Sequence, residues 1–143
     1  MAALISELLD DDPTHGLAGV VDTAAQESPD EYAIEPGGWA AARDNWIVID
    51  EPIEQGCLVR YELWDGEPAA HPPGASTWQG TVYLESGIIQ PEAIDGTYLA
   101  DSKFDLGRPG RRWNVRVHRE RLGHGAFPPE VVQRTLITLQ FWP

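Results

Sequence analysis

Apolar and polar residues alternate along most of the chain after residue 45. In CLVRYELW (57–64), Val59, Tyr61 and Leu63 alternate with charged residues, and the same period of two recurs in RTLITLQFW (134–142). A period of two is typical of strands with one buried and one wet face. Together with shorter apolar runs, it predicts seven strands, over residues 16–25, 46–50, 57–64, 78–86, 87–94, 113–120 and 134–142.

Turn-forming residues separate these segments at short intervals. The chain holds 14 Gly and 12 Pro, with Asp-Gly at 65–66 and 95–96 and Pro-Gly at 109–110. Short strands joined by such turns predict an all-β fold, an antiparallel β-sandwich of about seven to eight strands. We expect a short N-terminal helix over Ala2–Leu9 and one helical turn over Trp39–Arg43. We expect residues 1–143 to form one domain with an acidic N-terminal extension at about 1–15.

Charge is distributed unevenly along the chain, whose formal net charge is -13. Residues 1–55 hold thirteen acids and a single base, Arg43. Such a surface repels nucleic-acid phosphates and suits a basic protein partner. The candidate partner-binding residues are acids of this half together with two tryptophans placed opposite their strands' apolar residues: Asp30, Glu31, Glu35, Asp44, Asp50, Glu51, Glu54, Trp64 and Trp142.

Six of the ten basic residues fall between positions 108 and 121, in RPGRRWNVRVHRERLG. They are Arg108, Arg111, Arg112, Arg116, Arg119 and Arg121. Alternation within strand 113–120 turns Trp113 toward the core and Arg116 and His118 toward water. Because no exposed aromatic platform accompanies the arginines, we expect them to pair with the protein's own acids or with a subunit partner, and we expect no direct binding of nucleic acid.

Motifs for catalysis, metals or cofactors are lacking in the sequence. The one cysteine, Cys57, lies in an apolar strand and is expected to be a buried thiol. The histidines show no metal-ligand spacing, and no nucleotide-binding or nucleophile motif occurs, so we expect no metal and no cofactor. No run of apolar residues is long enough to span a membrane, so we expect a soluble, cytoplasmic protein.

Four segments resemble the ComJ-like family, the nuclease inhibitors of bacterial competence systems. GGWAAARDNWIVID (37–50) is similar to the family's Gly-aromatic-Ala-Ala segment leading into a strand, and CLVRYELWDG (57–66) to its next strand. TVYLESGIIQPEAI (81–94) resembles its paired strands around Gly-Ile, and KFDLGRPGRRWNVRVHRE (103–120) resembles its Phe-Asp-Leu, turn and strand pattern. The resemblance implies an antiparallel β-sandwich that binds and inhibits a nuclease.

Three functions therefore stay open at this point, in order of preference. The first is a non-enzymatic inhibitor or immunity-type partner of a basic nuclease, acting through the acidic surface. The second is a small-molecule or peptide-binding sandwich that uses loops 65–77 and 121–130. The third is an enzyme that uses His118 and His124 as a general acid–base pair.

Overall fold

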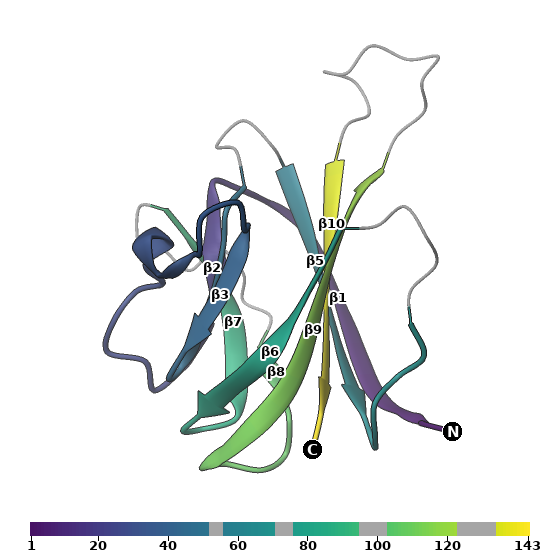
Figure 1. Ribbon diagram of the computed structural model, residues 1–143. Coiled ribbons are helices and arrows are strands. Elements are labelled where there is room, and N and C mark those ends of the chain that lie inside the picture. The colour runs from purple at the N-terminus through teal and green to yellow at the C-terminus, as the bar shows by residue number, and fades with distance from the viewer. Residues whose placement is uncertain (52–55, 71–75, 95–102, 123–133) are drawn as a thin grey trace.

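Strands make up most of the computed structural model, which describes residues 1–51, 56–70, 76–94, 103–122 and 134–143. Ten strands and one short 3₁₀ helix, η1, follow one another along this part of the chain (Figure 1). In chain order they are β1 (Leu4–His15), β2 (Leu17–Asp22), η1 (Glu31–Ala33), β3 (Ala40–Arg43), β4 (Trp46–Ile49), β5 (Gly56–Trp64), β6 (Ser76–Leu84), β7 (Ile88–Ala93), β8 (Phe104–Asp105), β9 (Arg111–Leu122) and β10 (Arg134–Trp142).

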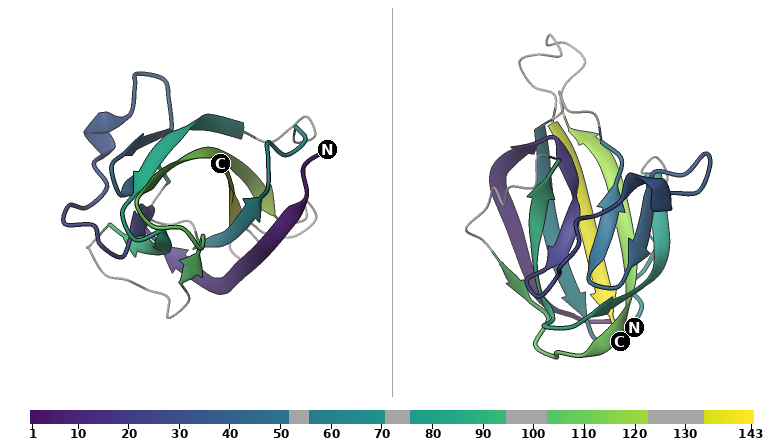
Figure 2. Two further views of the ribbon diagram at one scale, coloured as in Figure 1. Left: turned by 90° about the horizontal axis from the view of Figure 1, so that it is seen from below. Right: turned by 90° about the vertical axis from the view of Figure 1, so that its left-hand side faces the viewer.

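The strands form two five-stranded sheets that curve around a common core (Figure 2). Sheet A has the order β1-β5-β10-β9-β6 and sheet B the order β3-β4-β2-β7-β8. The predicted β-sandwich is therefore confirmed. Every strand pair is antiparallel except β5 and β10, which run parallel from Cys57↔Thr135 to Leu63↔Phe141.

Both helical predictions near the N-terminus are wrong. Ala2–Leu9 contributes to β1, which pairs with β5 and places Leu8 opposite Tyr61 at the core. Trp39–Arg43 leads into β3, which pairs with β4 through a two-residue turn. In both places, backbone pairing and burial against a neighbouring strand outweigh a weak local helix preference.

The core between the sheets combines the inward side chains of both. Its largest fully buried members include Trp113, Tyr61 and Phe141. Tyr61 stacks on Phe104 from sheet B, with ring centroids 5.4 Å apart and ring planes 12° apart. The alternation that predicted the inward faces of β5, β9 and β10 is confirmed by this cluster.

Part of the outer face of sheet A, over β9, is covered, contrary to expectation. The connection from β5 to β6 begins at Asp65, and its buried Pro68 lies over β9, where Arg116 donates to the carbonyl oxygens of Pro68 and Ala69 at 3.0 and 3.4 Å. The guanidinium also forms an ion pair of 2.8 Å with Glu67. Arg116 is therefore only 7% exposed, and the prediction that it faces water is wrong.

His118 lies under the same outer face and is 1% exposed, so its predicted surface position is also wrong. Its Nδ1 lies 3.2 Å from the Thr77 hydroxyl and its Nε2 lies 2.7 Å from Gln140 Oε1. Gln140 in turn donates to Glu62 at 3.1 Å. A chain of hydrogen bonds thus crosses four strands and satisfies the polar side chains that burial would otherwise penalise.

Asp22 joins the end of β2 to the turn between β6 and β7, and it is 1% exposed. Its Oδ2 accepts from the backbone N–H groups of Ser86 and Gly87 at 3.0 and 2.9 Å, and its Oδ1 accepts from the Ser86 hydroxyl at 2.6 Å. Oδ1 also accepts from the N–H of Ala24 at 2.8 Å, which fixes the first turn of the segment that follows β2. One carboxylate therefore ties three parts of the fold together.

Replacing Asp22 by Asn tests this role. The side-chain amide of Asn would place an N–H group opposite backbone N–H donors, which cannot accept a hydrogen bond. The substitution is therefore expected to lower the free energy of unfolding by about 2–3 kcal/mol. Urea unfolding followed by tryptophan fluorescence measures the change. Asp105→Asn is the matched control, because Asp105 is exposed and accepts from Gly107 in a local turn. Equal losses in the two variants would contradict the role assigned to Asp22.

Burial also controls the thiol of Cys57, which is 0% exposed and packs in the core. Desolvation, helped by the nearby Glu51 carboxylate, raises the pKa of Cys57 from 9.0 to about 12. The thiol of the folded protein therefore stays protonated at pH 9, whereas the same thiol ionises in the unfolded chain. Since the unfolded state then binds fewer protons, this group lowers stability as the pH rises above about 9.

We therefore expect Cys57 to react with an aromatic disulfide reagent at pH 8 only after denaturant is added. A Ser28→Cys variant provides the exposed control thiol and is expected to react at once. Rapid reaction of Cys57 in the native wild-type chain would show that the thiol is accessible.

Candidate protein-binding surface

An acidic segment, defined here as residues 23–38, crosses the outer face of sheet B. Its apolar residues Ala25, Ala33 and Ile34 pack on a second hydrophobic cluster on that face, which contains Trp46. The exposed acids Glu27, Asp30, Glu31 and Glu35 all lie on this segment, which holds no Lys or Arg. The fold thus holds a run of carboxylates on a well-packed apolar base.

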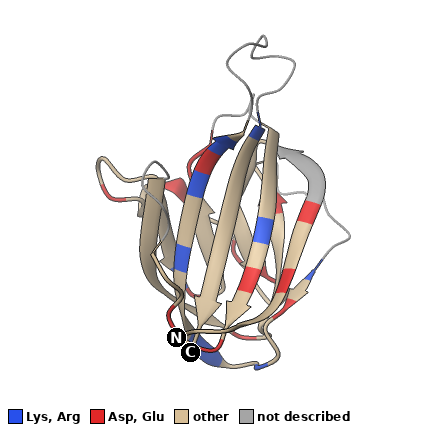
Figure 3. Cartoon of the chain, turned by 90° about the vertical axis from the view of Figure 1, so that its right-hand side faces the viewer, with Lys and Arg blue, Asp and Glu red and all other residues tan. Residues whose placement is uncertain are grey.

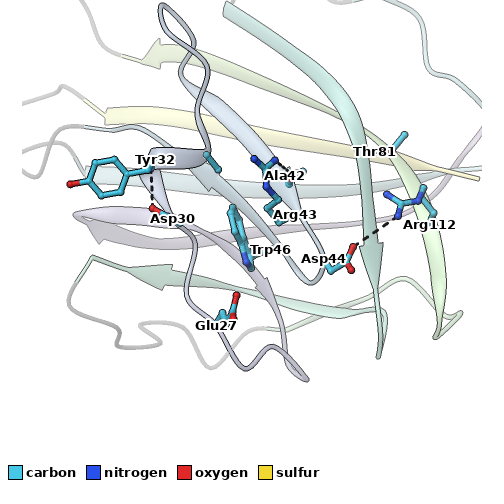
Figure 4. A pocket seen from close by; sticks show the side chains of 10 residues that line it. Glu27, Asp30, Tyr32, Ala42, Arg43, Asp44, Trp46, Thr81 and Arg112 are labelled. Atoms are coloured by element: carbon cyan, nitrogen blue, oxygen red, sulfur yellow. Dashed lines mark hydrogen bonds and ion pairs between the residues drawn. The ribbon is translucent and has the colours of Figure 1, made fainter.

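The middle of the acidic segment is ordered by η1. Asp30 caps this short helix, and its Oδ1 accepts from the backbone N–H of Tyr32 at 2.9 Å. Tyr32 itself is 89% exposed, and its phenol ring points away from Trp46 and Asp44 into solvent (Figure 4). Large exposed aromatic rings are uncommon on a surface that faces only water and are frequent at protein interfaces.

A groove of about 650 Å³ runs between the acidic segment and the turn that joins β3 to β4 (Figure 4). Trp46 lies among the groove's lining residues and is itself 5% exposed. The groove is lined by Glu27, Asp30, Tyr32, Ala33, Ala42, Arg43, Asp44, Trp46, Thr81 and Arg112. Three carboxylates, the two arginines Arg43 and Arg112, and the exposed Tyr32 therefore border one groove.

The β3–β4 turn holds Asp44 at the far side of the groove. Asn45 adopts a left-handed φ of 70°, and its backbone N–H donates to the carbonyl of Tyr83 in β6 at 2.7 Å. Its side-chain oxygen accepts from the N–H of Glu85 at 2.8 Å. Because the turn is fixed to the neighbouring sheet, the Asp44 carboxylate has a defined position. It lies 3.9 Å from Arg112 with both side chains largely exposed, which makes this a weak ion pair.

A second hollow brings together acids on the opposite side of the acidic segment. Glu31, Asp50 and Glu51 line it, and its volume is about 180 Å³. Asp50 is exposed, whereas Glu51 is only 6% exposed and pairs with Arg119 at 3.0 Å. Glu51 thus stabilises the fold and does not present a free carboxylate to a partner.

The remaining predicted site residues lie away from the groove. Trp64 is half-buried, and its indole N–H donates to Glu62 at 3.4 Å. Trp142 is 6% exposed and lies under Arg116, so its expected exposure is wrong. Its position opposite the apolar triplet is outward, but the β5–β6 connection and Arg116 cover that face. Glu54 lies outside the described residues.

Of the ten residues that line the groove, only Asp30 and Asp44 were predicted from the sequence as site residues. Glu27 and Tyr32 both lie in QESPDEYAIEPGG, where an aromatic residue stands directly after two acids in a stretch rich in Pro and Gly. A large apolar ring with no alternating neighbours is a signal for an exposed contact residue, and it could have indicated Tyr32.

Four of the six arginines of the 108–121 region, Arg111, Arg112, Arg116 and Arg119, contact other side chains of the chain. Arg112, Arg116 and Arg119 form ion pairs with Asp44, Glu67 and Glu51, respectively. The guanidinium groups of Arg111, Arg116 and Arg119 also lie 4.4–5.3 Å from the ring centres of Trp113, Trp142 and Trp39. The ion pairs occupy guanidinium N–H groups that a phosphate ligand would otherwise accept from. Cation–π attraction to the tryptophan rings holds these guanidinium groups further in place.

Another hollow, of about 780 Å³, lies beside Arg119 and Glu51. Its lining is Asp50, Glu51, Ser76, Arg119, Glu120, Arg121 and Thr135, all polar or charged. Small-molecule sites are mostly apolar, so this lining does not favour one here. Loop 65–77 is described only over residues 65–70 and 76–77, and most of loop 121–130, with His124, falls outside the described residues.

Among the described residues, no three His, Cys, Asp or Glu side chains gather as metal ligands would. Within the same residues, no helix has the length and apolar character needed to cross a membrane. The buried, hydrogen-bonded position of His118 also leaves it out of reach of a substrate.

Known structures share this fold. ComJ from Bacillus subtilis, an inhibitor of the DNA-degrading activity of NucA, matches with a TM-score of 0.52 and 16% identity over 98% of both chains. The protein of crocagin biosynthetic gene J matches with a TM-score of 0.58 and 17% identity, over 100% of this chain and 98% of that one. No family model and no curated protein matches the sequence. The resemblance to ComJ predicted from the sequence is therefore confirmed at the level of the fold.

Proposed function

We propose that this chain is a non-enzymatic inhibitor that binds a nuclease through the acidic segment and the groove beside it. The observation that carries the proposal is the exposed Tyr32 among the carboxylates of Glu27, Asp30 and Asp44. The shared fold with ComJ, which is described as the inhibitor of a DNA-degrading enzyme, supports the choice of a nuclease as the partner.

Electrostatics supply the physical reason for this choice. A nuclease must present cationic groups to the phosphates of its substrate, and a surface of carboxylates can occupy the same groups. The net charge of -13 also draws a basic partner over long distances and speeds association at low salt. Inhibition by this route requires no chemistry from the inhibitor, only a surface that competes with DNA.

Tyr32 would provide the short-range part of the contact. Interfaces draw most of their affinity from a few aromatic or arginine side chains that become desolvated near the centre of the contact. The ring of Tyr32 is exposed at the border of the groove, and its backbone N–H donates to the Asp30 carboxylate. A basic side chain of the partner can therefore pack on the ring while its charge meets the carboxylates.

Neutralising the acidic segment tests the proposal. The variant Glu27→Gln, Asp30→Asn, Glu31→Gln and Glu35→Gln keeps side-chain shape and removes four charges. Inhibition is measured as DNA degradation by the nuclease encoded nearest to this chain's gene and by NucA. Where the wild-type chain inhibits, the inhibition constant is expected to rise at least about 100-fold, since single close charge pairs contribute about 1.5–7 kcal/mol.

The matched control carries Asp65→Asn, Glu85→Gln, Asp105→Asn and Glu120→Gln. It has the same net charge as the test variant, so long-range attraction weakens equally in both. Inhibition by the control is expected to stay within about threefold of wild type. Equal losses in the two variants would mean that only overall charge matters. Failure of the wild-type chain to inhibit either nuclease would oppose the proposed function itself.

Tyr32 is tested separately. Tyr32→Ala is expected to weaken inhibition about tenfold or more, because the truncation removes an exposed aromatic contact of the kind that dominates interfaces. Tyr32→Phe keeps the ring and is expected to stay close to wild type. Both variants should unfold at the wild-type urea concentration, because Tyr32 is 89% exposed. Unchanged inhibition by Tyr32→Ala would remove Tyr32 from the interface.

A further inference from the structure

The two sheets have four edge strands, and three of them are protected. β3 and β6 lie beside each other and are joined by the hydrogen bond from Asn45 to Tyr83. β8 is only two residues long. β1, with twelve residues, is the border strand of sheet A, and no strand of the described part of the chain pairs with its outer side (Figure 3). Long unpaired edges readily accept another strand, and natural proteins usually block them.

Exposed apolar side chains gather on this same edge. Seven large hydrophobic side chains are exposed in the described part of the chain, and four of them are Met1, Leu4, Ile5 and Leu9. Ile5 is 60% exposed and Leu9 is 44% exposed. On an edge strand such residues favour contact with a further strand, because they offer apolar area next to unpaired backbone groups.

Irregularities in the pairing of β1 with β5 limit the length of β1 with which a partner strand can pair. The pairing of β1 with β5 shifts between Leu4 and Ser6 and again between Asp10 and Thr14. Between these shifts, Ser6–Asp10 keeps a regular register, and Pro13 beyond it lacks a backbone donor. A short partner strand can therefore pair with the regular stretch Ser6–Asp10, which directly follows Ile5.

Two kinds of strand could pair with the outer edge of β1: a second copy of β1 or a segment of another protein. The charge of β1 favours the second. Within Ser6–Asp10 the exposed acid is Glu7, which lies on the same face of the strand as Leu9, whereas Asp10 is only 4% exposed. Antiparallel pairing of two copies of β1 centred on Glu7 would place the two Glu7 carboxylates opposite each other in chains that each carry a net charge of -13, and like charges across strands are destabilising. A strand with a basic residue two positions away from an apolar residue fits instead, because every second side chain of the partner strand faces Glu7 and Leu9 together.

We propose that the outer edge of β1 binds an extended, basic segment of a partner protein by adding it as a further strand to sheet A. This inference goes beyond the proposed nuclease inhibition, because it concerns a different surface and does not need the partner to be a nuclease. Hydrogen bonds between backbones would provide the affinity, and the carboxylate of Glu7 would provide the preference for a basic segment.

Disulfide tethering to an Ile5→Cys variant tests the proposal directly. The full-length variant is equilibrated in a thiol redox buffer with seven-residue peptides that carry one cysteine and, at three successive positions of one strand face, either Val, Lys and Val or Val, Glu and Val. A third peptide is the Lys form N-methylated at its internal amides, so that it cannot pair with a strand. The fraction of mixed disulfide is measured by mass spectrometry. The native Cys57 is 0% exposed and does not compete.

The Lys peptide is expected to be captured at position 5 about tenfold more than either other peptide, since N-methylation removes several hydrogen bonds of roughly 1 kcal/mol each. Ser28→Cys is the matched control, because Ser28 lies beside Glu27 in the acidic segment but in no strand. At position 28 the Lys peptide and its N-methylated form are expected to be captured equally.

Three results would overturn the proposal. The first is equal capture of the Lys peptide and its N-methylated form at position 5, which would leave only charge attraction. The second is better capture of the Glu peptide. The third is a dimer of the unmodified chain in sedimentation that Leu9→Lys dissociates, which would make a second copy the occupant. None of these results depends on nuclease inhibition, so this inference and the proposed function can fail separately.

Discussion

The carboxylate of Asp22 connects the parts of the molecule on which both fold and surface depend. It receives hydrogen bonds from Ser86 and Gly87, at the turn where the chain passes from sheet A to sheet B, and from Ala24, where the acidic segment begins. A buried carboxylate is costly unless several donors satisfy it, so this position specifies one arrangement of these three elements. The acidic segment is thereby placed over the cluster around Trp46, and Tyr32 is held outward.

Covering segments on the outer faces explain which polar residues are buried. The acidic segment lies over sheet B, and the start of the β5–β6 connection lies over sheet A. Under the latter, Arg116 meets Glu67 and two backbone carbonyls, and His118 belongs to a hydrogen-bonded chain across four strands. A period-two pattern distinguishes the two faces of a strand but cannot say that a loop from elsewhere will cover the outer one. For this reason the alternation placed Trp113 correctly and misjudged Arg116, His118 and Trp142.

Strand alternation with turn chemistry was sufficient to predict the sandwich and most of its strands, including β5, β9 and β10. It failed at Leu4–Leu9, where the apolar spacing fits a helix as well as a strand and long-range pairing with β5 decides. The candidate site was predicted in part. Asp30 and Asp44 share one groove, but the pairing of Glu51 with Arg119 depends on contacts between distant residues. Tyr32 was missed because no periodic pattern marks a residue in a loop.

The proposed nuclease-binding surface is the acidic segment together with its groove. Amide hydrogen exchange of this chain, measured with and without a nuclease that it inhibits, tests that claim most directly. If the nuclease covers this surface, the amides of residues 27–35 and of the turn at Asp44–Asn45 exchange more slowly in the complex. Unchanged exchange across these residues, with slowing confined to other surfaces, would contradict it.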